Sequence, residues 1–267
     1  MDQDVVAEGG PVIAYDIDGS GPAAVFIHGI TDDRADWDPV TRDLRDDLTC
    51  VRVDLRGHGG SEPGPPWDMD ALANDVLRVI DHLELERPHV VGHSLGGMVA
   101  TFLAGRCPVA SVTNVDQPLR LDAFAAGLRE LEPSLRGPAF PETLLAISHS
   151  LGFDRLPRHA QDRLGAHRLG ADPATVLGIW DVVFTSSELE LRALVEAATG
   201  QVTAPYVALH GSDPGDDYRT WLEASIPSSR FELWDGDGHY PHLVHPEEFR
   251  SLLLRLVAGT TTRTEIA

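Results

Sequence analysis

The chain contains no lysine, and all 21 of its basic residues are arginine, set against 42 aspartate and glutamate residues. The absence of lysine excludes chemistry through a lysine Schiff base. The formal net charge of -21 disfavours nucleic acids and anionic membranes as partners, because both are polyanions. We interpret the acidic excess as a solvated surface that aids solubility.

Cysteine and long apolar runs are also scarce. Cys50 and Cys107 have neither a neighbouring cysteine nor metal-ligand spacing, so we expect reduced thiols in a cytoplasmic protein. No run of about 18 apolar residues is present, and no membrane span is expected. The N-terminal stretch MDQDVVAEGG lacks the basic and apolar regions of a secretory signal. A globular composition remains, with a length that suits one large domain or a domain with an insertion.

Strand and helix patterns alternate along most of the chain. Residues 4–9 and 11–18 predict a hairpin. Short apolar runs that predict buried strands follow at 23–30, 48–55, 89–94, 109–116, 204–213 and 230–237. Helical patterns follow most of them, at 35–47, 68–86, 95–107, 217–226 and 245–259. This alternation predicts an α/β fold with a mostly parallel sheet and helices on both faces.

The alternation is interrupted after the sixth predicted strand. Residues 118–200 carry mostly helical patterns punctuated by prolines. We therefore expect a core domain of residues 1–117 and 201–267 with a helical cap, or lid, inserted at 118–200. Five apolar side chains of the cap are candidates to line a pocket, although packing between helices is the interpretation we favour for each of them: Leu119, Phe124, Trp180, Val183 and Phe184.

A Gly-x-Ser-x-Gly motif lies at the junction of a predicted strand and a predicted helix. Residues 92–96 read Gly-His-Ser-Leu-Gly. A strand–turn–helix setting strains the serine backbone and exposes the hydroxyl, while the flanking glycines relieve crowding. The N-terminus of the helix favours negative charge that develops beside it. We predict that Ser94 is a nucleophile rather than a helix cap.

His239 is the predicted base for this serine, whose hydroxyl is a weak nucleophile on its own. It follows the last predicted strand and precedes the last helix, which places it on the same sheet edge as Ser94. His93 flanks the serine but is expected to point away from the site, and His242 and His245 lie toward the helix.

Two backbone N–H groups form the predicted oxyanion hole. Leu95 supplies one at the start of its helix. Ile30 supplies the other, because it follows His28-Gly29 at the end of a predicted strand, where the glycine permits a tight turn.

Four short sequences of the chain are similar to motifs of a known protein family. They are FIHG (26–29), DLRGHGGSE (54–62), GHSLGG (92–97) and GHYPHL (238–243). In order and spacing they resemble the α/β-hydrolase superfamily over nearly the whole chain. The resemblance implies the α/β-hydrolase fold, with an eight-stranded, mostly parallel sheet, helices on both faces, a variable cap and a Ser–acid–His triad. It also implies that His58 is structural.

The triad acid has two candidates. The family usually places it after the seventh strand, where Asp213 stands one residue short of the usual spacing and is followed by Asp216 and Asp217. Some members carry it after the sixth strand, where Asp116 stands. Both places suit the geometry, and we favour Asp213 over Asp116.

These residues predict a serine hydrolase that cleaves a carboxylic ester or lactone through an acyl-enzyme intermediate. The expected partner is a small, apolar ester or lactone; neither a metal nor an organic cofactor is expected. The same fold also supports C–C bond hydrolysis, acyl transfer, lyase activity and cofactor-free perhydrolysis, and a non-catalytic ligand-binding homologue is a further alternative. We leave open whether the chain acts alone or as a homodimer.

Overall fold

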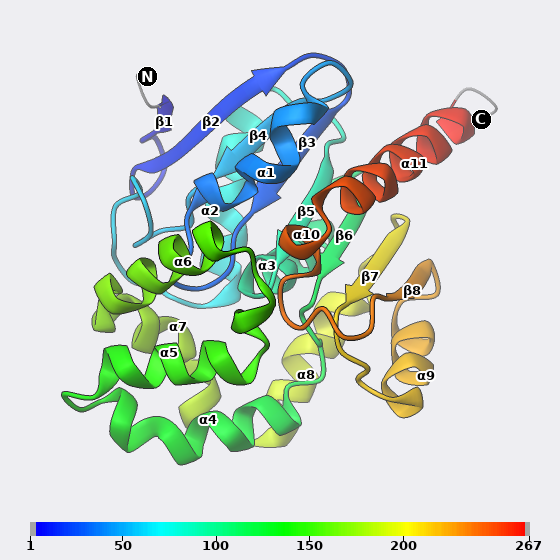
Figure 1. The fold of residues 1–267 in the computed structure, drawn as a ribbon. Helices are drawn as coiled ribbons and strands as arrows, with labels where there is room; N and C mark the ends of the chain where they lie inside the picture. The colour runs from blue at the N-terminus through cyan, green and yellow to red at the C-terminus, as the bar shows by residue number, and fades with distance from the viewer. Residues whose placement is uncertain (1–3, 265–267) are drawn as a thin grey trace.

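Among residues 4–264, which the computed structural model describes, eight strands form one sheet in the order β1-β2-β4-β3-β5-β6-β7-β8 (Figure 1). The strands are β1 (Asp4–Val6), β2 (Ile13–Gly19), β3 (Ala23–Ile27), β4 (Thr49–Val53), β5 (His89–His93), β6 (Ser111–Val115), β7 (Tyr206–His210) and β8 (Ser229–Leu233). β2 runs antiparallel to β1 and β4, and all the other pairs are parallel. The predicted eight-stranded, mostly parallel sheet is confirmed.

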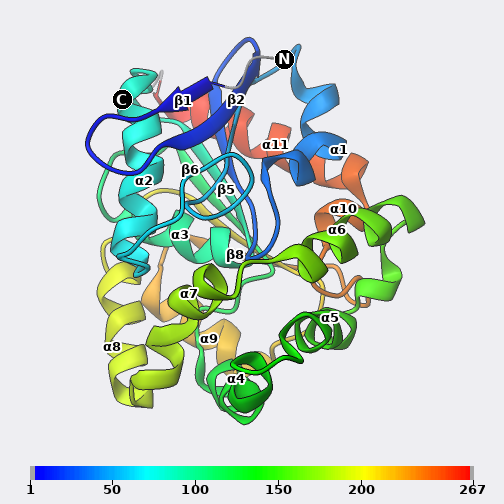
Figure 2. The ribbon, with the colours of Figure 1, turned by 90° about the vertical axis from the view of Figure 1, so that its left-hand side faces the viewer.

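Helices cover both faces of this sheet (Figure 2). The core helices are α1 (Asp38–Thr41), α2 (Met69–His82), α3 (Leu95–Ala104), α9 (Asp216–Ser225), α10 (Pro241–Val244) and α11 (Pro246–Thr264). Successive side chains of a strand point to opposite faces, so alternate residues of β3 enter different cores. Val25 and Ile27 pack with residues of α2 and α3, whereas Ala24 and Phe26 pack with residues of α1 and α11. No helix of the described part of the chain has both the length and the apolar character that a bilayer crossing requires.

The helix predicted at 35–47 is instead three short pieces. They are η1 (Arg34–Trp37), α1 and η2 (Arg42–Leu44), where η denotes a 3₁₀ helix. Pro39 has no N–H to donate to the carbonyl of Ala35, so the regular α-helical hydrogen bonding is interrupted at this point. That carbonyl accepts the amide of Asp38 in the 3₁₀ turn, and the guanidinium of Arg163 also donates to it, at 3.0 Å.

Five α-helices separate β6 from β7 in the chain. They are α4 (Asp122–Leu135), α5 (Phe140–Ser150), α6 (Arg158–Gly170), α7 (Pro173–Thr185) and α8 (Glu188–Thr199), with the short 3₁₀ helix η3 (Phe153–Arg155) between α5 and α6. Figure 1 shows these inserted helices together, beyond the arrowheads of β5, β6 and β7. They therefore lie at the carboxyl edge of the parallel strands, where α/β sheets usually bind ligands.

Candidate active site

Ser94 occupies a strained turn between β5 and α3. Its φ of 51° and ψ of -123° lie outside the regions that non-glycine residues usually adopt. The turn is so tight that neither Gly92 nor Gly96, two residues before and after Ser94, could carry a side chain. A Cβ on Gly92 would lie 2.0 Å from the carbonyl oxygen of Gly96, and a Cβ on Gly96 would lie 2.2 Å from that of Ile27. The half-buried serine lines a large cavity between the sheet edge and the inserted helices.

His239 lies on the loop between β8 and α10 and lines the same cavity. Its Nδ1 is 2.7 Å from Oδ2 of Asp116, the residue that directly follows β6. The other carboxylate oxygen of Asp116 accepts the amide of Gly211 at 2.8 Å and lies 3.6 Å from Nδ1 of His210. Burial raises the pKa of Asp116, but the two histidine rings outweigh it and hold that pKa below its ordinary value. Asp116 is therefore an anion that faces His239.

The preference for Asp213 over Asp116 does not match this geometry. Asp213 is exposed, accepts the amide of Gly215 at 2.8 Å and pairs with Arg219 at 2.7 Å. Asp116 makes the contact with His239 that was expected of Asp213. The reason is the path of the chain after β7, which turns at Gly211 beside Asp116 and carries Asp213 out to the surface in front of α9. Asp216 and Asp217 are exposed in the first turn of that helix.

The expectation that His93 points away from the site was wrong. Its buried ring is 4.7 Å from the ring of His239, between ring centres, and its Nε2 donates to the His239 carbonyl at 2.8 Å. Burial lowers the pKa of His93. His93 thus holds the His239 loop in place through this hydrogen bond, and it also lines the cavity. The sequence carried no signal for this contact, because it joins residues 146 positions apart.

The loop after β3 brings Ile30 to the cavity, as α3 brings Leu95. Within the described residues, neither backbone N–H donates to a backbone carbonyl, so both amides are available to a ligand. The loop is held from behind by His58, whose Nε2 accepts the amide of Thr31 at 3.1 Å while Nδ1 donates to the Arg56 carbonyl at 3.0 Å. Burial, with neighbouring His28, lowers the pKa of His58 to about 4, which keeps Nε2 free to accept.

The cavity has a volume of about 890 Å³ and is lined largely by apolar side chains. Many of these apolar side chains come from α3, α7 and α8, and they include Met98, Phe102, Ile179, Leu191, Leu194 and Val195. Of the five candidates from the sequence, Phe124, Trp180 and Val183 line the cavity. Leu119 is fully buried in the core, and Phe184 packs under the Arg136 guanidinium.

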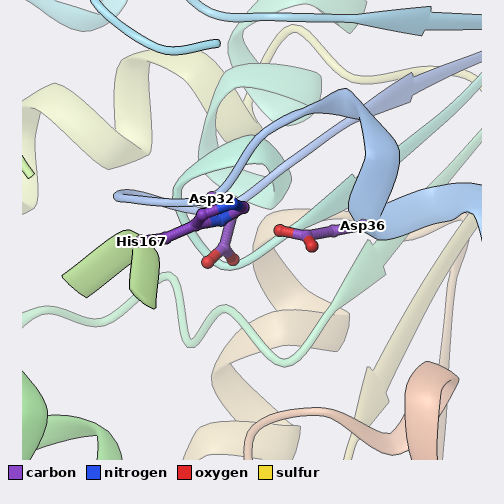
Figure 3. A group of neighbouring side chains, drawn as sticks. All are labelled: Asp32, Asp36 and His167. Atoms are coloured by element: carbon purple, nitrogen blue, oxygen red, sulfur yellow. The ribbon is translucent and has the colours of Figure 1, made fainter. Parts of the chain in front are cut away.

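Polar side chains also line the cavity, and one of them, Asp32, belongs to a group of potential metal ligands. Carboxylate oxygens of Asp32 and Asp36 and a ring nitrogen of His167 lie within 4.8 Å of one another (Figure 3). The two aspartates follow β3 and the histidine belongs to α6, so the grouping was not visible in the sequence. Each carboxylate is already paired with a guanidinium group: Asp32 with Arg168 at 2.5 Å and Asp36 with Arg163 at 2.6 Å. A cation here would compete with both pairs, and we assign no metal to this cluster.

Comparison with known proteins agrees with the fold and defines the class. The model of the alpha/beta hydrolase family matches residues 24–252, and the chain belongs to this family. It is 33% identical over 254 residues to 3-oxoadipate enol-lactonase 1 of Acinetobacter baylyi, which covers 90% of this chain and 91% of that protein. It is 28% identical over 276 residues to an uncharacterized protein of Mycobacterium tuberculosis, which covers 92% of this chain and 78% of that protein.

A solved structure shows the same fold from end to end. A hydrolase from Pseudomonas aeruginosa superposes with a TM-score of 0.79 at 22% identity, covering 96% of this chain and 98% of that one. The family predicted from the four short sequences is therefore confirmed, and the protein is an alpha/beta hydrolase.

Proposed function

We propose that the protein is a serine hydrolase that cleaves a carboxylic ester or lactone through an acyl-enzyme intermediate. The observation that carries the proposal is the 2.7 Å bond between Nδ1 of His239 and Oδ2 of Asp116, in a cavity that Ser94 also lines. A hydroxyl nucleophile is activated by a histidine that a buried carboxylate orients, and His239 and Ser94 line the same cavity.

The reaction follows from the roles of these groups. Ser94 Oγ attacks the substrate carbonyl carbon and His239 accepts its proton, while Asp116 fixes the histidine tautomer and stabilises the imidazolium. The N–H groups of Ile30 and Leu95 stabilise the negative charge on the carbonyl oxygen. His239 then protonates the leaving alkoxide, and the acyl group remains on Ser94. A water molecule, deprotonated by His239, then attacks the acyl carbon. The bond to Ser94 Oγ breaks, His239 returns the proton to Oγ, and the acid is released.

The inserted helices at 118–200 act as the cap in this proposal and select the substrate. The support is that many of the apolar side chains that line the cavity come from these helices. We therefore propose a small ester or lactone with an apolar acyl or alcohol part. Support comes from the A. baylyi relative, which is an enol-lactonase and aligns over nine-tenths of both chains.

Covalent labelling tests the nucleophile. The folded protein is treated with a fluorophosphonate and its peptides are analysed by mass spectrometry, with Ser94→Ala as the matched control. We expect one adduct, on Ser94, and much slower labelling in His239→Ala. If the folded wild-type protein forms no adduct on Ser94 at any pH at which it stays folded, the proposal fails.

Turnover of a substrate panel tests the reaction type. Esters and lactones of graded chain length are compared with amides of the same acyl groups, and acyl transfer to added alcohols is measured in parallel. We expect ester or lactone hydrolysis to dominate. A protein that is labelled on Ser94 but hydrolyses neither would perform another reaction of this fold, such as C–C bond hydrolysis.

A further inference from the structure

We propose that Arg168 is a positioning residue that completes the active site from the inserted segment. Its guanidinium ties helix α6 to the loops that carry Ile30 and His239, and it neutralises a carboxylate buried beside Ser94. The site is then competent only when α6 is seated on the core. This inference rests on the proposed serine hydrolase function.

The contacts of Arg168 reach three separate elements of the protein. Nη1 donates to Oδ1 of Asp32 at 2.5 Å, on the loop after β3. Nη2 donates to Oη of Tyr240 at 2.6 Å, next to α10. Nε donates to Oγ of Ser148 at 3.1 Å, on α5. The side chain is only 4% exposed, so these bonds form out of competition with solvent.

Two of these partners adjoin the proposed catalytic groups. Asp32 is two residues from Ile30, and its own amide donates to the carbonyl of Gly29 at 3.2 Å, which closes the turn that presents the Ile30 N–H. Tyr240 directly follows His239. A shift of Arg168 would therefore move the oxyanion donor and the base relative to each other, and small misplacements of such groups are costly for catalysis.

The charge of Asp32 gives Arg168 a second role. A Cβ placed on Gly29 would lie 2.9 Å from Oδ2 of Asp32 and 3.2 Å from Cβ of Ser94, so the carboxylate and the nucleophile flank the same backbone position. Burial raises the pKa of Asp32, but Arg168 and His93 outweigh it and keep the group ionised. Without the guanidinium, this buried anion would oppose the negative charge that develops on the substrate oxygen.

The same helix provides a matched control. Arg163, five residues earlier on α6, pairs with Asp36 at 2.6 Å. Asp36 lies on the same segment as Asp32 (Figure 3). The side chains that line the cavity include Arg168 but not Arg163. Removal of either arginine thus takes one positive charge from α6 and one ion pair from a buried aspartate. The two sites differ in that Arg163 is 32% exposed and Arg168 4%, and in that Asp32 keeps Nδ1 of His93 at 3.7 Å while burial and the charge of Asp32 raise the pKa of Asp36.

The test compares Arg168→Met with Arg163→Met, using ester turnover and the rate of fluorophosphonate labelling of Ser94. We expect Arg168→Met to lower kcat and the labelling rate about 100-fold while KM changes little, because groups that act in the transition state are displaced. Arg163→Met should keep both rates within a few-fold of the wild type, even if both variants unfold at lower temperature. Equal rates for Arg168→Met and wild type would overturn the inference while leaving the proposed function intact, whereas a wild-type protein without labelling would overturn both.

A double variant separates a specific role from simple loss of packing. In Arg168→Met with Asp32→Asn, the unpaired charge is gone, and we expect at least about a tenfold recovery of kcat over Arg168→Met. If Arg168 had only a structural role, the double variant would be no more active than Arg168→Met, and that result would also overturn the inference.

If Arg168→Met does not fold, Arg168→Lys serves in its place. It keeps a positive charge for Asp32 but cannot hold Tyr240 and Ser148 at once, so an intermediate loss of kcat is expected.

Discussion

The carboxylate of Asp116 holds the ring of His239 through a 2.7 Å bond to Nδ1, and its second oxygen is occupied by the Gly211 amide at 2.8 Å. β6 and β7 are neighbours in the sheet, and the amide of Asp116 itself donates to the Leu209 carbonyl at 2.7 Å. Backbone groups at the end of β7 thus fix the aspartate that follows β6. The orientation of His239 therefore depends on the packing of these two strands.

This relationship predicts unequal effects of two isosteric substitutions. Asp116→Asn should lower kcat/KM for an ester by about 10⁴-fold, because an amide does not hold the histidine in the required tautomer. Asp213→Asn should change it by no more than about twofold, since an exposed ion pair contributes little. Steady-state kinetics on both variants checks the ranking. A larger loss of kcat/KM in Asp213→Asn than in Asp116→Asn would show that Asp213 is the triad acid.

Two glycines of the chain should respond to alanine with opposite signs. A Cβ on Gly96 would meet the backbone oxygen of Ile27 at 2.2 Å, so Gly96→Ala should lower the free energy of unfolding by about 1–3 kcal/mol. Gly127 lies within α4 with open space around its Cβ position. Gly127→Ala should raise stability by about 0.5–1 kcal/mol, because alanine is the better helix former. Urea unfolding measures the free energy of unfolding of both variants. An unchanged value for Gly96→Ala would show that the turn at Ser94 has room for a methyl group.

The apolar side chains that line the cavity predict how the preference for acyl chain length can be changed. Val183 is buried on α7 and lines the cavity. Val183→Trp should reduce kcat/KM for long acyl esters about tenfold relative to acetate, because the added ring occupies the space of several methylenes. Leu189→Trp is the control, since Leu189 is 77% exposed and should leave the preference unchanged. Equal effects on short and long esters in Val183→Trp would place the acyl chain elsewhere.

Two buried histidines predict a loss of stability in mild acid. Burial lowers the pKa of His58 and of His89 to about 4. An unfolded histidine binds its proton near pH 6.5, as is usual for this residue. Between about pH 6.5 and 4 the unfolded chain therefore binds protons that the folded chain excludes. The free energy of unfolding should fall on acidification through this window, by up to about 3 kcal/mol for each histidine.

Urea unfolding at several pH values across that window measures the slope. His89→Gln should make the dependence on pH shallower, because one of the buried histidines whose pKa is lowered has been removed. His159→Gln is the control, since His159 is exposed and should leave the slope unchanged. A stability that is flat across the window would show that these histidines are protonated in the folded state.

Much of the local structure was predictable because its causes lie within a few residues. The apolar run before Gly92 and the helical pattern after Ser94 predicted β5 and α3 correctly. The sequence was misleading where one residue breaks a longer pattern, as Pro39 does in the segment predicted to be one helix. It was also misleading for His93, whose position depends on a carbonyl 146 residues away.

By itself, the sequence determined the alternation of strands and helices, the helical character of the segment between β6 and β7, and the turn that bears Ser94. Hydrophobic periodicity and close-packed glycines act over short distances along the chain. Only the tertiary structure decided which aspartate faces His239, because that contact joins residues 123 positions apart through the pairing of β6 with β7. It alone also brought Arg168 against Asp32, 136 residues away, where two buried charges can be stable only as a pair.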